Sequence, residues 1–172
     1  MSRAFNKAVT ALFEAGMRQF PDFAFEKPSV HFGLPGERAY CIRHADNVAW
    51  ICLVLSPKGY NEFTVEFGWS LMGRYPQWTT RPNVAVFDEA ALAATPEGFV
   101  RLRLQRAPAR HDWWSIVAEE DALTFAGAEL ACAALDADQA RELAAPLVLD
   151  AMDCVATTGR ALAQRILAFR LG

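Results

Sequence analysis

The chain has 172 residues, a hydrophobic fraction of 53%, a charged fraction of 22% and a net charge of −3. This size allows a core that holds without a metal ion or a disulfide, and the composition excludes a disordered chain. The negative charge gives no general attraction to nucleic acid or to anionic membranes. We therefore expect one folded domain over residues 1–172, with no nucleic-acid or membrane partner.

The N-terminus alternates polar and apolar residues, which is unlike the continuous apolar core of a secretory signal. The longest apolar run, Val48 to Leu55, is much shorter than the ~18–20 residues that span a bilayer. These features predict a cytoplasmic protein. The cysteines form no C-x-x-C pair, so we expect buried reduced thiols, no metal site and no cofactor; they are Cys41, Cys52, Cys132 and Cys154.

The first expected element is a helix from about Arg3 to Gln19, which ends at Pro21. Its apolar residues recur at helical spacing and form one stripe, composed of Phe5, Val9, Leu12, Phe13 and Met17. The pattern predicts an amphipathic helix that covers a core.

A period of two then replaces the helical period. From Asn61 to Leu71, large apolar residues alternate with small or polar ones, which predicts a strand with one buried face and one wetter face. Val48 to Leu55 is apolar at every position and predicts a central strand. Arg38 to His44 predicts a third strand, and Pro57 and Gly59 suit a hairpin loop. Short connections between consecutive strands predict an antiparallel meander.

Further elements are expected on both sides of this meander. The segment Phe23 to Phe32 could hold an edge strand, and Phe99 to Gln105 alternates as another strand does. Phe87 to Ala94 suits a short helix at best. From Asp136 the chain becomes helical, with Gln139 at the spacing of a capping box. The apolar stripe expected on this helical end contains Leu143, Leu147, Ala151, Cys154 and Val155.

Together these elements predict an α+β fold in a single domain. We expect an antiparallel sheet of about four to six strands, with the N-terminal and C-terminal helices packed on one face. Pro146 is expected to kink or restart the C-terminal helix. The expected core includes Leu12, Trp50, Phe63, Phe67, Trp69 and Ile166.

Charge is unevenly distributed along the chain. The stretch Glu119 to Asp153 holds nine acidic residues and one basic residue, Arg141. The simplest interpretation is a basic strand that meets acidic helices within the same fold, and the alternative is a binding site for an external anion. The basic cluster consists of Arg101, Arg103, Arg106, Arg110 and His111.

Three segments occur in an order that resembles a widespread bacterial domain family of unknown function. They are F-T-V-E-F-G at residues 63–68, R-L-R-L at 101–104 and H-D-W-W at 111–114. The family pattern is a strand close to F-T-V-E-x-G, an R-x-R-L-like strand and a D-W-W turn. The resemblance covers roughly Phe5 to Phe169 and implies the same kind of fold. The family has no assigned catalytic residues, so none is transferred to this chain.

Glu66 is a candidate for chemistry because it lies in the middle of a strand, on the wetter face. It could act as a general base, or it could pair with Arg101 or Arg103 on a neighbouring strand, and we favour pairing. The histidines have no partners at metal-ligand spacing, and the chain has no G-x-S-x-G or phosphate-loop motif. The sequence therefore favours a protein that is not an enzyme, with no catalytic residue assigned.

The stretch His111 to Trp114 ends in two adjacent tryptophans. In a strand their side chains point to opposite faces, so one ring is expected in the core and the other at the seam with the C-terminal helical segment. Asp112 is expected to accept an indole N–H or to cap the following turn. A scaffold role is favoured over a protein-binding surface and over a ligand pocket.

Two functions from different classes follow. The first is a non-catalytic protein-interaction domain of accessory or immunity-like type, whose partner and oligomeric state stay open. The second is a small-ligand-binding protein or enzyme with a pocket over the sheet, in which Glu66 is the working residue. The pocket walls would be Trp69, Tyr75, Trp78, Arg101 and Arg103. Whether the wetter face of the sheet is open or closed distinguishes the two.

Overall fold

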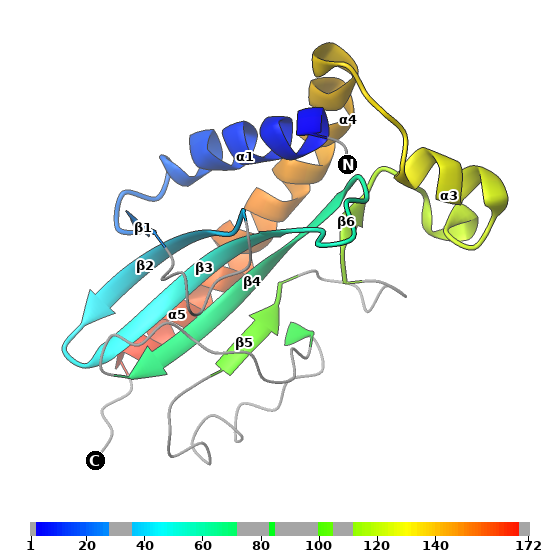
Figure 1. Ribbon diagram of the computed structural model, residues 1–172. Helices are drawn as coiled ribbons and strands as arrows, with labels where there is room; N and C mark the ends of the chain where they lie inside the picture. The colour runs from blue at the N-terminus through cyan, green and yellow to red at the C-terminus, as the bar shows by residue number, and fades with distance from the viewer. Residues whose placement is uncertain (1–2, 28–35, 72–82, 85–99, 105–111, 169–172) are drawn as a thin grey trace.

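The structure is a computed structural model that describes residues 3–27, 36–71, 83–84, 100–104 and 112–168. Its antiparallel sheet has the strand order β1-β2-β3-β4-β5, and β6 pairs with the same edge of β4 as β5 does (Figure 1). The strands are β1 (Ala24–Glu26), β2 (Arg38–His44), β3 (Asn47–Leu55), β4 (Glu62–Leu71), β5 (Val100–Arg103) and β6 (Trp114–Ser115). The predicted antiparallel meander is confirmed, and the predicted edge strand is the short β1.

Helices cover one face of this sheet. Helix α1 (Arg3–Met17) packs on α4 (Ala137–Cys154), and α5 (Arg160–Ala168) continues along β3 and β2. The short helix α3 (Phe125–Ala131) stands to the side of this layer, beyond β6 (Figure 1). The predicted α+β fold, with both terminal helical regions on one face, is confirmed. The segment Phe87 to Ala94 lies outside the described residues.

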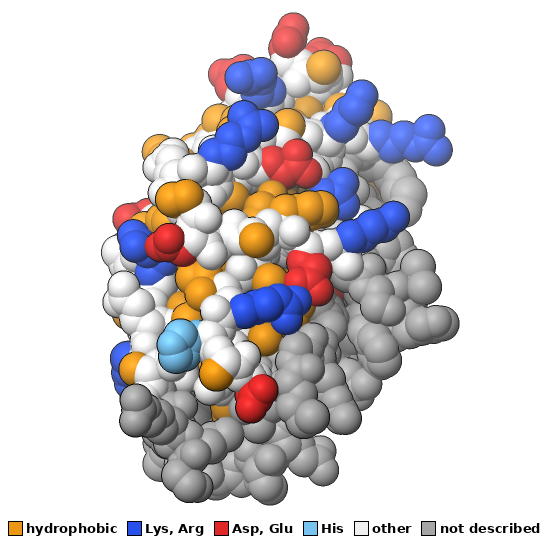
Figure 2. Space-filling view, turned by 90° about the vertical axis from the view of Figure 1, so that its left-hand side faces the viewer, with side chains coloured by type: hydrophobic (Ala, Val, Ile, Leu, Met, Phe, Trp, Pro, Cys, Tyr) orange, Lys and Arg blue, Asp and Glu red, His pale blue; other side chains and the backbone are white. Residues whose placement is uncertain are grey.

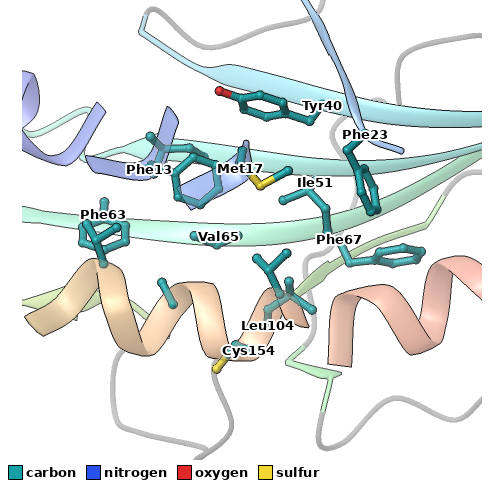
Figure 3. Packing of buried hydrophobic residues seen from close by; sticks show 14 of the residues in the cluster. Phe13, Met17, Phe23, Tyr40, Ile51, Phe63, Val65, Phe67, Leu104 and Cys154 are labelled. Atoms are coloured by element: carbon teal, nitrogen blue, oxygen red, sulfur yellow. The ribbon is translucent and has the colours of Figure 1, made fainter. Parts of the chain in front are cut away.

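The main core lies between the sheet and these helices (Figure 3). Phe13 and Met17 of α1 meet the inward side chains of β3 and β4, among them Ile51 and Phe67. Trp50 is buried as expected, but it points to the opposite face of the sheet, where it joins Cys41, Cys52 and two smaller residues. The sheet is therefore buried on both faces around β3.

The C-terminal helix buries most of the predicted stripe, with Ala151, Cys154 and Val155 buried and Leu147 partly buried, but it leaves out Leu143. Leu143 is 38% exposed and Leu149 is 73% exposed. The buried positions of α4 are mostly small residues, namely Ala140, Ala144, Val148, Ala151 and Cys154. Small side chains let α4 approach α1 closely: a Cβ added at Gly16 would lie 2.8 Å from Cγ of Met152. Close helix packing, which the sequence pattern does not reveal, explains why alanines are buried in place of Leu143 in the first turns of α4.

The ends and interruptions of α4 follow from local chemistry. Asp136 caps its N-terminus, with Gln139 completing the predicted capping box. The helix continues through Pro146, so of the two expected outcomes, a kink or a restart, the restart does not occur. The interruption comes later, as a π-helical turn at Val155–Gly159. A Cβ at Gly159 would lie 3.0 Å from Cδ1 of Ile51, so this glycine lets the helix approach the sheet.

Among the described helices, none is long and apolar enough to cross a membrane.

Replacing Phe67 by Ala should lower the free energy of unfolding by about 3–5 kcal/mol, because it empties a closely packed part of the core. Phe125, which is 80% exposed, provides the matched control. Phe125→Ala should change stability by about 0.5 kcal/mol or less. Chemical denaturation measures both values, and a loss under about 1 kcal/mol for Phe67→Ala would contradict the assigned core.

Candidate functional site

The sheet face opposite the helices carries a buried ion cluster formed by Arg101, Glu66 and Glu37. Arg101 Nε donates a hydrogen bond to Glu66 Oε2, and its Nη2 donates to Glu37 Oε1. All three side chains are closed to solvent. The predicted pairing of Glu66 with Arg101 is confirmed. The expectation of a solvent-exposed pair on a wetter face is wrong, because this face is buried at Glu66.

Strand register explains how these groups meet. Glu66 lies opposite Arg103 across the β4–β5 pair, and Arg101 lies opposite Gly68. Gly68 also lies opposite Trp50 of β3. Because glycine has no side chain, nothing on this face of β4 separates the Trp50 indole from the Arg101 guanidinium. Arg101 reaches diagonally to Glu66. A period of two correctly placed both residues on one face, but it gave no information on what covers that face.

Glu37 was not identified from the sequence. It comes immediately before β2, after Gly36, whose φ of 84° suits glycine. Glu37 ends the short segment L-P-G-E, whose proline and glycine are typical of a turn, and a turn residue is normally solvated. The only available signal was a carboxylate at the start of a strand, and it did not indicate a buried partner for Arg101.

The second basic residue of β5 has a partner of its own. Arg103 Nη1 donates a 2.8 Å hydrogen bond to Asp112 Oδ2, and Asn83 Nδ2 donates to the other carboxylate oxygen at 2.9 Å. The Arg103 guanidinium lies 5.9 Å from the centre of the Trp113 ring. The prediction that the basic strand meets the acidic helices is therefore wrong for Arg101 and Arg103. Their carboxylate partners lie before β2, on β4 and before β6.

The two adjacent tryptophans have separate environments. Trp114 is buried, stacks on Phe63 at 5.6 Å, and donates its indole N–H to Asp150 of α4 at 2.7 Å. It is thus the predicted core ring and also makes the contact with the C-terminal helix. Trp113 is half-buried beside Arg103. Asp112 was expected to accept an indole N–H or to cap the following turn. Its carboxylate instead accepts hydrogen bonds from Arg103 and Asn83, and Asp150 accepts the Trp114 indole N–H.

The described residues among those proposed for a pocket over the sheet do not line one together. Trp69 is buried on the helix side, where its indole donates to Asn47 Oδ1, so it lies on the face opposite Glu66. Tyr75, Trp78 and His111 lie outside the described residues. Within the described ranges, no three His, Cys, Asp or Glu side chains converge as they would around a metal ion.

An open groove lies instead beside α3. It has a volume of about 560 Å³ and is bounded by the β3–β4 hairpin loop, β6 and α3. Leu123, just before α3, is 74% exposed at this groove, and Phe125 on the same helix end is 80% exposed. The larger side chains of its lining are Lys58, Tyr60, Glu62, Trp113, Trp114, Val117, Leu123 and Leu147. Of the described candidates from the sequence, two line this groove, Trp113 and Trp114.

Asn61 connects α3 to the sheet. Its backbone N–H donates to the carbonyl of Ala131 at 2.7 Å, and its side-chain amide donates to the carbonyls of Leu130 at 3.3 Å and Ala133 at 3.0 Å. Its own carbonyl accepts from the N–H of Ile116. One buried residue at the start of β4 thus satisfies carbonyls at the end of α3, where a helix has no internal donors. The sequence offered no sign of this role, because its partners are about seventy positions away.

The other end of α3 is held as tightly. Thr124 caps the helix by accepting a hydrogen bond from the N–H of Gly127 at 2.9 Å. Gly127 packs against the 3-10 turn Glu119–Asp121, and a Cβ there would lie 1.9 Å from the carbonyl oxygen of Asp121. Only glycine fits this contact. The short helix is therefore fixed at both ends although its outer side chains face solvent.

The thiols divide by environment. Cys132 is exposed and lines the groove, so the expectation of buried thiols is wrong at this position and confirmed at Cys41, Cys52 and Cys154. Burial, and a hydrogen bond donated to Glu26, raise the pKa of the Cys41 thiol to about 11. Cys41 is therefore protonated near neutral pH and is a poor nucleophile.

Replacing Arg101 by Met should destabilise the protein by about 3–5 kcal/mol, because two carboxylates would lose their buried partner. Arg38 forms a half-exposed pair with Glu14 and provides the matched control. Arg38→Met should cost about 0–1 kcal/mol. Equal losses for the two variants, measured by chemical denaturation, would show that the buried cluster has no special role.

In the native protein near neutral pH, a maleimide should modify Cys132 first, and Cys132→Ser should remove this fast reaction. The reaction of Cys41 should rise only as the pH approaches about 11, because the thiolate forms above its raised pKa. Mass spectrometry of timed samples measures both. A second thiol modified as fast as Cys132 would contradict the burial pattern.

The described chain thus presents a closed ion cluster on one sheet face and an open groove beside α3. No family model matches the chain, and no curated protein or solved structure matches it.

Proposed function

We propose that the protein is a non-catalytic interaction domain that binds another protein through the α3 surface. This surface comprises the exposed side chains of Leu123, Phe125 and Leu130 together with the groove beside α3. One observation carries the proposal: large apolar side chains are held in solvent on a helix that is fixed at both ends. Single exposed apolar residues are common, whereas several within one short segment beside a groove are typical of a binding surface.

The rigidity of α3 supports this proposal. A surface that must order itself on binding loses affinity to conformational entropy, whereas a fixed one does not. Asn61 and Thr124 fix the two ends of α3 without using Leu123 or Phe125. The walls of the groove include tryptophan and tyrosine, the residue types enriched at the energetic centres of interfaces.

The alternative function, a ligand-binding protein or enzyme that uses Glu66 and Arg101, has less support. A general base must come within hydrogen-bond distance of the proton that it removes. Glu66 is fully buried and accepts a hydrogen bond from Arg101, which also binds Glu37. A substrate would have to open this cluster before it reached the carboxylate. The arrangement is suited to holding strands β4 and β5 in register.

We further propose that the chain is a bacterial accessory or immunity-like protein that acts in the cytoplasm. The order of its F-T-V-E-F-G, R-L-R-L and D-W-W segments, which resembles a bacterial domain family of unknown function, supports this part of the proposal. An immunity-like protein neutralises its partner by covering it, and a rigid apolar surface is suited to that role.

The double variant Leu123→Glu, Phe125→Glu should lose partner binding while keeping the wild-type melting temperature, because both side chains are mostly exposed. Leu149→Glu on α4, at a residue 73% exposed, is the matched control. Proteins captured from the native host by wild type but not by the double variant would be purified and titrated by calorimetry. We expect a loss of about tenfold or more for the double variant only. If wild type, the double variant and Leu149→Glu all bind the partner with equal affinity, the proposed surface is contradicted.

A further inference from the structure

A second groove lies between α1 and α4, on the solvent side of the helical layer. It has a volume of about 840 Å³, and its lining is apolar apart from Gln19, Asp150 and Asp153. Leu149, which is 73% exposed, stands in it. The groove shares no lining residue with the groove beside α3. A large leucine held in solvent within an apolar groove indicates a surface that binds another molecule.

The charged residues of this lining have one sign. Asp150 and Asp153 are both exposed on α4, and α1 contributes no charge to the lining. The carboxylate of Asp150 also accepts the indole N–H of Trp114. Over its whole length α4 contains four acidic residues and one basic residue, Arg141. An occupant of this groove should therefore offer apolar contact together with positive charge.

The outer side of α1 has that chemistry. Four of its residues recur at every fourth position and are all exposed, namely Arg3, Lys7, Ala11 and Ala15. Residues at this spacing lie along one side of a helix. Ala15 also lines the groove, so this side of α1 adjoins it directly. The stripe combines positive charge with alanines, whose small side chains let another helix approach closely.

The acidic residue of α1 does not cancel this positive charge. Glu14 pairs with Arg38 of β2, and close by Arg43 of β2 pairs with Glu26 of β1. Figure 2 shows basic and acidic side chains interspersed on this side of the molecule, where α1, β1 and β2 meet. Opposite charges there are matched within one copy of the chain. The basic residues of the exposed α1 stripe lie on the other side of the helix, which adjoins the groove.

We infer that a second copy of the chain binds at the α1–α4 groove, so that two copies form a symmetric dimer in which α1 of each copy lies against α4 of the other. A two-fold dimer uses the same surface on both copies, so that surface must contain both halves of a complementary pair. The α1–α4 surface does, because its α1 stripe is basic and small and its groove is apolar and acidic. The inference is independent of the proposed function, since α3 takes no part in it.

The size of this surface sets the strength to expect. Helix α4 has 18 residues and is therefore about 27 Å long, and two neighbouring helices are about 20 Å wide. The face is thus on the order of 500 Å² on each copy, and stable interfaces begin at about 1,000 Å² for the two copies together. We therefore expect a reversible dimer whose population rises with protein concentration.

Sedimentation velocity of the full chain over a wide concentration range measures this equilibrium. Leu149→Glu should weaken dimerisation about tenfold or more, because it replaces an apolar contact by a third carboxylate beside Asp150 and Asp153. Leu123→Glu with Phe125→Glu, on the α3 surface, is the matched control and should dimerise as wild type does. The melting temperature of Leu149→Glu, measured where wild type is monomeric, should be unchanged because this side chain is mostly exposed.

An exchange of charges tests which helices meet. The variant Arg3→Glu, Lys7→Glu makes the α1 stripe acidic, and Asp153→Lys makes the α4 wall less acidic. Each variant alone should dimerise about tenfold more weakly than wild type at low salt, because like charges then face each other. Mixed in equal amounts, the two should form a heterodimer, because each new charge then meets an opposite one on the other copy. Added salt should reduce these differences.

Three results would overturn the inference. The first is a wild-type chain that stays monomeric at every concentration. The second is a dimer that Leu149→Glu leaves unchanged, which would place the contact on another face. The third is a mixture of the two charge variants that associates no better than each variant alone. None of these results concerns the α3 surface, whose partner binding is titrated separately with Leu149→Glu as the variant that keeps it.

Discussion

The alternation of side chains along β4 is the constraint on which the described structure depends. Its odd-numbered residues, such as Phe63 and Phe67, fill the core beneath the helices. Its even-numbered residues face the other way, where Glu66 binds Arg101. Asn61, just before the strand, holds the end of α3. A shift of one residue in this strand would exchange its two faces and would place a carboxylate among the core aromatics.

The buried cluster of Arg101 with two carboxylates fits that constraint. Removing three charged groups from water is costly, and their mutual attraction recovers the loss only with good hydrogen-bond geometry. Such a cluster is therefore weak evidence for added stability, but it discriminates strongly between registers. Only one pairing of β4 with β5 brings Glu66 to Arg101, and Glu37 ties the start of β2 to the same point. We interpret the cluster as a contact that selects this strand register over the alternatives.

The groove beside α3 depends on contacts between distant parts of the chain. Asn61 joins the β3–β4 hairpin to the end of α3, and Trp114 joins β6 to Asp150 of α4. These two connections hold the elements that form the walls of the groove in place. Leu123 and Phe125 then remain exposed because α3 is anchored by its backbone and by Gly127, so its outer side chains are not needed for folding.

The sequence by itself determined the elements whose signal is local. A helical stripe, an alternating strand and a capping box at Asp136 each depend on residues a few positions apart, and all three were predicted correctly. The sequence also placed Glu66 and Arg101 on neighbouring strands. The buried stripe of α4 was predicted correctly at Ala151 and Cys154, but tertiary structure alone decided its first turns, because close packing on α1 buries alanines there in place of Leu143. It also decided that Glu37 completes the ion cluster and that Asn61 binds the end of α3, since both contacts join residues more than sixty positions apart.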